Sequence, residues 1–113
     1  MMKKSLLEND IIKFEMPEEI DLVNSQEIKK TVYEESIEKG YKKVILDFSK
    51  TRYIDSTGLG IIVAIHKQTL MNAGALVLIN FDSNIRNLLK MTSLDRIFNI
   101  FDSEKEAIEF LNK

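Results

Sequence analysis

Hydrophobic residues change their spacing several times along this chain, and each change predicts a new element. Ile12 and Phe14 alternate with polar residues, which is typical of a half-buried strand. Asn9-Asp10 comes just before them and tolerates the positive φ of a tight turn. The pattern therefore predicts a hairpin of two short strands over residues 4–16.

A helical spacing follows over residues 24–39, where one narrow apolar stripe recurs every four residues. Glu35 and Lys39 are one turn apart and can form an ion pair. Gly40 supplies the residue at which such a helix stops. The segment is predicted to be one helix that ends at Gly40.

Three later runs, 42–49, 75–79 and 97–101, are short and rich in branched or aromatic residues. The first two lack a clean alternation, which is typical of strands covered on both faces. Residues 58–71 are apolar on nearly every side and predict a buried helix. Strands and helices therefore alternate through the middle of the chain.

Two further helices are predicted near the C-terminus. Ser83 can cap a short helix, and Ser103 with Glu106 three residues later forms a capping box that starts the last one. The order ββαβαβαβα predicts an α/β fold, a single domain over residues 1–113 with one mixed, mostly parallel β-sheet covered by about four helices.

Composition narrows the possible partners and cofactors. Sixteen basic and eighteen acidic side chains are interleaved and give a formal charge of −2, so no basic stripe is available for nucleic acid. The chain has no cysteine, which excludes a disulfide framework and thiolate metal sites. A single histidine cannot build a zinc site without several carboxylates. We expect no metal, no cofactor and no nucleic acid.

The chain also lacks the features of a secreted or membrane protein. The segment MMKKSLLEND has an apolar stretch of only two residues, which is too short for a signal peptide. No later segment has the apolar length needed to span a bilayer. We expect a cytoplasmic protein that does not bind membranes.

The segment YIDSTGLG, residues 53–60, places an acid and two hydroxyl groups before two glycines. A catalytic serine does not fit, because Ile54 replaces the first glycine of the G-x-S-x-G turn. His66 follows Ser56 by ten residues on one helix, roughly 15 Å away, so it cannot act as its base. The glycines also form no phosphate-binding loop for a nucleotide. We therefore predict no catalytic residue.

A structural role explains part of this segment. Either Asp55 or Ser56 can cap the following helix, an interaction worth about 1 kcal/mol. A cap explains one polar residue, whereas Asp55, Ser56 and Thr57 come in succession. Small residues in a first helical turn let another surface approach, and a helix N-terminus favours added negative charge. A phosphate on Ser56 is therefore compatible with the predicted fold.

Other polar and apolar residues receive simpler interpretations. His66 and Lys67 are expected on an exposed edge of the long helix, because one histidine lacks convergent partners. Met71 and Met91 are expected to fill the core. A polar helix start is expected at the same end of the sheet as Ser56. It consists of Asp82, Ser83, Asn84 and Arg86.

The segments YIDSTGLGIIVAIHKQ and GALVLINFDSNIRNLLKMTSLDRIF resemble the STAS-domain anti-sigma factor antagonists of bacteria. In that family the serine after the motif's aspartate is phosphorylated by the partner kinase, which is itself the anti-sigma factor. The resemblance therefore implies phosphorylation at Ser56, with Thr57 as the neighbouring hydroxyl. Asp21, in EEIDLVNS, resembles an aspartate near the family's partner-facing surface. Glu18-Glu19 and Ser93 depart from the usual family pattern.

The resemblance implies a non-enzymatic switch. The unphosphorylated form would bind the anti-sigma factor serine kinase and free its sigma factor, phosphorylation would end binding, and a PP2C-type phosphatase would reset the chain. An alternative is a STAS module of a stress-signalling scaffold or of a lipid or anion transport system. The residues expected at the partner-binding surface are Asp21, Asn24, Asp55, Ser56, Thr57, Gly58, Leu59 and Ser83.

Overall fold

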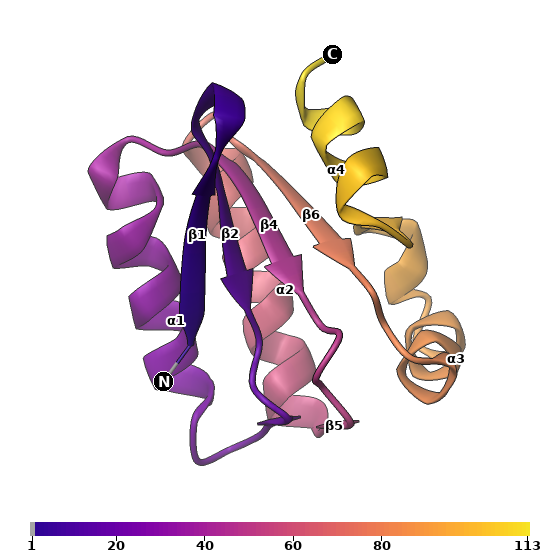
Figure 1. Ribbon diagram of the computed structural model, residues 1–113. Helices are drawn as coiled ribbons and strands as arrows, with labels where there is room; N and C mark the ends of the chain where they lie inside the picture. The colour runs from indigo at the N-terminus through magenta and orange to yellow at the C-terminus, as the bar shows by residue number, and fades with distance from the viewer. Residues whose placement is uncertain (1) are drawn as a thin grey trace.

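The computed structural model describes residues 2–113 and places five strands in one sheet, in the order β1-β2-β4-β6-β7. Helices α1 and α2 cover one face of this sheet, and α4 lies against the other face beside β6 (Figure 1). The strands are β1 Lys3–Leu7, β2 Ile11–Glu15, β4 Lys43–Asp47, β6 Ala75–Ile79 and β7 Asn99–Phe101. The helices are α1 Ser25–Glu35, α2 Ser56–Met71, α3 Ser83–Met91 and α4 Glu104–Leu111.

The predicted mixed sheet is confirmed. Strand β1 pairs antiparallel with β2, whereas the remaining pairs in this sheet are parallel. Asn9 and Asp10, in the turn between β1 and β2, have φ values of 61° and 59°. Asparagine and aspartate tolerate this left-handed conformation better than most residues, so the local sequence suffices to close the predicted hairpin.

Strands β4 and β6 form the middle of the core. Val44 and Leu46 point to the side of α1 and α2, whereas Ile45 and Val77 point to the side of α4, and all four are fully buried. Apolar side chains are needed on both faces, so these strands show no polar alternation. The prediction of covered strands at 42–49 and 75–79 is confirmed.

The prediction of one helix over residues 24–39 is wrong in its length. Helix α1 ends at Glu35, because Ser36 leaves the helical region with φ −117° and ψ −88°. The Ser36 hydroxyl donates to the carbonyl of Val32, and the chain continues as a short 3-10 turn, Ile37–Lys39. Gly40, at φ 88°, then ends that turn as expected from its freedom to adopt positive φ.

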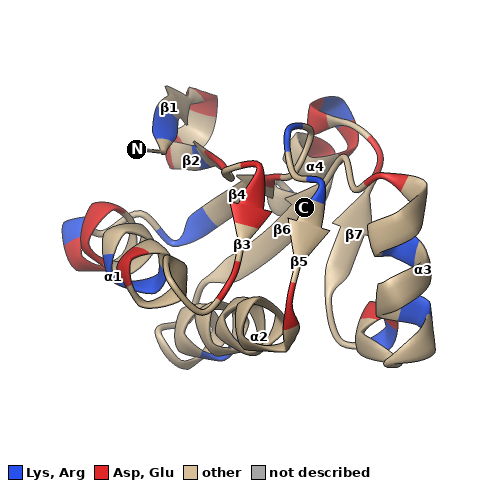
Figure 2. Cartoon of the chain, turned by 90° about the horizontal axis from the view of Figure 1, so that it is seen from below, with Lys and Arg blue, Asp and Glu red and all other residues tan. Residues whose placement is uncertain are grey.

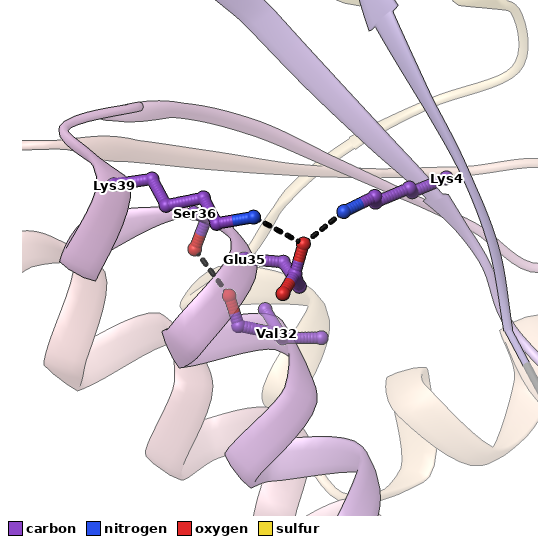
Figure 3. A network of polar contacts seen from close by, with 5 residues as sticks. All are labelled: Lys4, Val32, Glu35, Ser36 and Lys39. Atoms are coloured by element: carbon purple, nitrogen blue, oxygen red, sulfur yellow. Dashed lines mark hydrogen bonds and ion pairs between the residues drawn. The ribbon is translucent and has the colours of Figure 1, made fainter.

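The predicted ion pair between Glu35 and Lys39 forms, with Nζ and Oε1 2.8 Å apart. The same carboxylate oxygen also pairs with Lys4, so one acid connects α1 with β1 (Figure 3). Hydrogen bonds from Lys39, which has the larger effect, and from Lys4 lower the pKa of Glu35 to about 2. The unfolded chain lacks these bonds and titrates near the ordinary value of 4.5.

We expect Glu35 to contribute a pH-dependent part of the stability. Its contribution is present above pH 4.5 and is lost as the pH falls toward 2, because the unfolded state binds the proton first. Urea unfolding of Glu35→Gln should therefore depend less on pH in this window than unfolding of the wild type. Glu34→Gln, at an exposed neighbouring position, is the control. Parallel pH profiles for wild type and Glu35→Gln would contradict the expectation.

Helix α2 is not buried on every side, in contrast to the prediction. It covers the sheet through one face, and Leu70 and Met71 near its end are 52% and 85% exposed. Met91, the last residue of α3, is 82% exposed, so the prediction that Met71 and Met91 fill the core is also wrong. Both methionines are the last residues of their helices, beyond the part of each helix that packs on the core.

Two features complete the fold. Ser103 caps α4 as predicted, since its hydroxyl accepts a hydrogen bond from the Glu106 backbone N–H at 3.2 Å. The Glu106 carboxylate accepts from the Ser103 hydroxyl, also at 3.2 Å, which differs from the reciprocal backbone bond of a capping box. A second, two-stranded parallel sheet was not predicted from the sequence; in it, β3 Glu19–Ile20 pairs with β5 Tyr53–Ile54. Among the described residues, no helix is both long and apolar enough to cross a membrane.

Candidate functional site

Asp55 forms the N-terminal cap of α2. It follows β5 directly, and its Oδ1 accepts a hydrogen bond from the backbone N–H of Gly58 at 2.8 Å. Of the two candidate caps, the structure therefore selects Asp55. Ser56 becomes the first helical residue and is exposed, while Thr57 is half-buried.

The second oxygen of Asp55 holds a different part of the chain. Oδ2 accepts a hydrogen bond from the backbone N–H of Leu22 at 3.1 Å. The backbone N–H of Asp55 donates in turn to the carbonyl of Ile20, also at 3.1 Å. One aspartate thus fixes the loop after β3 to the first turn of α2, next to Ser56. Figure 2 looks onto this edge, with β3 and β5 beside α2.

Gly58 allows the β3 segment to lie close against the first turn of α2. A Cβ at this position would lie 2.4 Å from the carbonyl oxygen of Ile20 and 2.9 Å from Cγ2 of Ile54. Gly58 is therefore buried under the β3 segment, which corrects its prediction as a partner-contacting residue. Gly60 has open space where its Cβ would stand and lies on the exposed side of the helix.

Asp21 and Asn24 shape the loop between β3 and α1. Oδ1 of Asp21 accepts hydrogen bonds from the backbone N–H groups of Val23 at 3.0 Å and Asn24 at 3.3 Å. The Asn24 side chain accepts from the Asp21 N–H at 3.0 Å and donates to the Glu19 carbonyl at 2.7 Å. Their polar atoms are largely engaged within the loop, so they act on this surface by fixing its shape.

This loop presents two apolar side chains whose exposure was not predicted from the sequence. Leu22 is 72% exposed and Val23 is 92% exposed. The available signal was an apolar pair between two turn-forming residues, Asp21 and Asn24. Because the Leu22 N–H is bound by Asp55, the pair is held beside the start of α2.

The remaining predicted residues lie on the same helix or at the same edge. Leu59 is half-buried and packs on the core. Ser83 does not cap α3, because Asp82 accepts from the Ile85 N–H at 2.9 Å and takes that role. Ser83 is instead the exposed first residue of α3. Helices α2 and α3 both begin where parallel strands end, so their N-termini share one edge of the sheet (Figure 2).

His66 is not on an exposed edge, in contrast to the prediction. It is buried against the ring of Phe98, with centroids 5.5 Å apart in an edge-on arrangement. Its Nδ1 has no hydrogen-bond partner among the described residues, and burial lowers its pKa. Lys67 is exposed as expected.

Within residues 2–113, no group of three histidines or acids is placed to hold a metal ion.

We expect Asp55→Ala to lower the free energy of unfolding by about 1.5 kcal/mol. About 1 kcal/mol comes from the lost helix cap, and the rest from the lost bond to the Leu22 N–H. Asp82→Ala is the matched control, because it removes one cap and no second contact. It should cost about 1 kcal/mol. Urea unfolding measures both, and a smaller loss for Asp55→Ala would contradict the two-sided role of this carboxylate.

Comparisons with known proteins identify the family of this chain. Residues 6–107 match the family model of the STAS domain. The chain is 35% identical over 101 residues to a candidate anti-sigma factor antagonist of Thermotoga maritima, a match that covers 89% of each protein. The crystal structure of a candidate antagonist from that organism has a TM-score of 0.90 and 32% identity, covering 99% of this chain and 95% of that one.

More distant proteins also match this chain, in sequence or in fold. The anti-sigma F factor antagonist of Paenibacillus polymyxa is 24% identical over 90 residues, which are 80% of this chain and 77% of that protein. The Bacillus cell fate determinant SpoIIAA, solved in its phosphorylated form, has a TM-score of 0.73 and 20% identity, covering 96% of this chain and 97% of that one. By its family model and its relatives, the chain belongs to the STAS domain family, in the group of anti-sigma factor antagonists.

Proposed function

We propose that this chain is a non-enzymatic, cytoplasmic partner switch controlled at Ser56. Its unphosphorylated form binds an anti-sigma factor that is also a serine kinase, and this binding releases the sigma factor. The kinase transfers phosphate to Ser56 and the complex dissociates. A PP2C-type phosphatase removes the phosphate and resets the cycle.

One observation carries the proposal: Ser56 is exposed at the first turn of α2, directly beside the capping carboxylate of Asp55. A kinase can reach an exposed hydroxyl without unfolding the chain. The helix N-terminus stabilises added negative charge, so the fold can carry a phosphate there. Thr57 is half-buried and is the less accessible hydroxyl.

The surroundings of Ser56 support a protein partner. Leu22 and Val23 are exposed apolar side chains on a loop that Asp55 fixes next to Ser56. Burial of such side chains favours association, at about 25 cal/mol per Å² of apolar surface removed from water. A phosphate within this surface adds about −1.5 to −2 charges that a partner would have to desolvate.

The proposal is tested by affinity capture with Ser56→Ala as bait, because this variant cannot be phosphorylated at Ser56 and should hold the kinase longest. The captured kinase is then incubated with wild-type protein and ATP, and mass spectrometry locates the phosphate. Phosphate on Ser56, and none in Ser56→Ala, is the expected result. Phosphate on any residue other than Ser56, or no phosphate, would count against a switch at Ser56. Capture without any such kinase would favour the alternative of a scaffold or transport module.

A further inference from the structure

Tyr53 is an exposed aromatic residue on β5, which leads directly to the start of α2 and Ser56 (Figure 2). The Tyr53 side chain is 54% exposed, whereas the next residue, Ile54, is buried. In the two-stranded sheet Tyr53 stands opposite the exposed Glu19 of β3, and Ile54 stands opposite the buried Ile20. One face of this small sheet therefore packs on the core, and the other presents the phenol ring to solvent.

The backbone that carries this ring is fixed by hydrogen bonds. The N–H groups of Arg52 and Tyr53 donate to the carbonyl of Glu18, at 2.8 Å and 3.3 Å. The Arg52 guanidinium turns back to its own loop, where it donates to the carbonyls of Ser49 at 3.0 Å and Thr51 at 3.3 Å. Because the segment is already ordered, binding of the ring by a partner costs little further conformational entropy.

A protein contact centred on Ser56 also covers Tyr53. Three residues of extended chain span at most about 11 Å, which sets the largest distance between the Cα atoms of Tyr53 and Ser56. A specific protein interface buries about 800 Å² on each partner, and a round patch of that area has a radius of roughly 16 Å. The partner surface of the proposed function therefore extends over the ring of Tyr53.

Tyr53 is expected to contribute more to such a contact than its exposed apolar neighbours Leu22 and Val23. A tyrosine offers a large ring with only two side-chain torsions to restrict. Residues that dominate interface energies are enriched in tyrosine, whereas leucine and valine are under-represented among them. Leu22 and Val23 are then expected mainly to exclude water from the contact.

The charge beside Tyr53 indicates what the partner carries there. Glu18 and Glu19 are exposed, and neither forms an ion pair within residues 2–113. Arg52 is the exposed basic residue on the same segment as Tyr53, so two acids against one arginine leave a net negative charge. A surface complementary to these acids is basic.

We infer that Tyr53 is the principal binding residue for the anti-sigma factor kinase, an inference that rests on the proposed function. The kinase receives the phenol ring in an apolar pocket, which basic side chains border on the side of Glu18 and Glu19. Burial of the ring favours association, whereas the two acids remain solvated and steer the approach of the partner. A phosphate on Ser56 differs from these acids, because a contact centred on Ser56 removes it from water.

Truncation of Tyr53 tests its role in binding. Calorimetric titration with the kinase should give a Kd about 30-fold higher for Tyr53→Ala than for the wild type. Tyr53→Thr, which keeps a high strand propensity without the ring, should lose as much. Tyr53→Phe keeps the ring and should stay within about threefold of the wild type. Met71→Ala is the matched control, because Met71 is 85% exposed at the opposite end of α2, and its Kd should not change.

The outcomes separate this inference from the proposed function. A Kd for Tyr53→Ala and Tyr53→Thr equal to that of Met71→Ala would overturn the inference and leave the switch at Ser56 standing. A wild-type chain that binds no anti-sigma factor kinase would overturn both.

Stopped-flow association rates test the basic border of the partner's pocket. Glu18→Gln combined with Glu19→Gln should lower kon about fivefold at low ionic strength, and the difference should shrink as salt screens the charges. Glu8→Gln combined with Glu109→Gln removes the same two charges from exposed positions in the β1–β2 turn and on α4. This control pair should change kon little. Equal effects of the two pairs would overturn the assignment of a basic partner surface.

Discussion

Phosphorylation of Ser56 is expected to weaken binding to the anti-sigma factor kinase about 150-fold, which corresponds to about 3 kcal/mol. The phosphate adds about −1.5 to −2 charges beside Asp55. The backbone N–H groups of Gly58 and Leu22 already donate to the two oxygens of Asp55. Neither donor is therefore free to bind the phosphate and offset its charge. A partner surface that accepts a neutral hydroxyl beside Leu22 and Val23 must then desolvate or expel the phosphate.

Binding measurements on four forms separate charge from shape. Ser56→Ala should bind like the unphosphorylated protein, and Ser56→Asp should bind more weakly, though less so than the phosphorylated form, because aspartate carries less charge than phosphate. Asn87→Asp adds a comparable charge at an exposed position on α3 and serves as the control. Calorimetric titration with the kinase gives each Kd. The same Kd before and after phosphorylation would remove the basis of the switch.

The second large effect is expected on stability, from Gly58→Ala. The new Cβ would stand 2.4 Å from the Ile20 carbonyl oxygen, and this obstacle is backbone, so it cannot swing aside. Overpacking of this kind costs about 3 kcal/mol, and the better helix propensity of alanine returns about 1 kcal/mol. The net loss of about 2 kcal/mol should lower Tm by roughly 8 °C for a domain of this size.

Gly60→Ala is the matched control for Gly58→Ala, because it makes the same change two residues further along α2. No atom lies within 4 Å of a Cβ built at Gly60. Alanine should therefore stabilise the helix there by up to about 1 kcal/mol. Thermal unfolding of the two variants should shift Tm in opposite directions. Equal shifts would show that Ile20 does not press on the helix at Gly58.

The main elements of the fold could be predicted because each is encoded by neighbouring residues. Asn9-Asp10 specifies the hairpin turn and Ser103 specifies the start of α4, in both cases through local hydrogen bonding or φ preference. The uninterrupted apolar runs at β4 and β6 identified covered strands. The break in α1 at Ser36 escaped prediction, because serine is compatible with a helix as well as with its end.

The candidate site was found from the sequence only in part. The Asp-Ser-Thr-Gly motif drew attention to Ser56 and to a helix start, and these positions could be inferred from local chemistry. The sequence did not reveal Leu22 and Val23 as exposed neighbours of that motif, because they lie more than thirty residues away. Their placement depends on β3 pairing with β5, and a two-residue strand leaves too short a pattern to detect.

The sequence by itself therefore determined the order of the main strands and helices, the hairpin, the cap of α4 and the presence of one hydroxyl-rich helix start. The tertiary structure alone decided which of two neighbouring residues caps α2, which glycine is sterically required and which apolar side chains remain exposed. It also buried His66 and left Met71 in solvent. The physical reason is that caps and turns depend on bonds between residues a few positions apart. Exposure and close approach depend instead on segments that only the folded chain brings together.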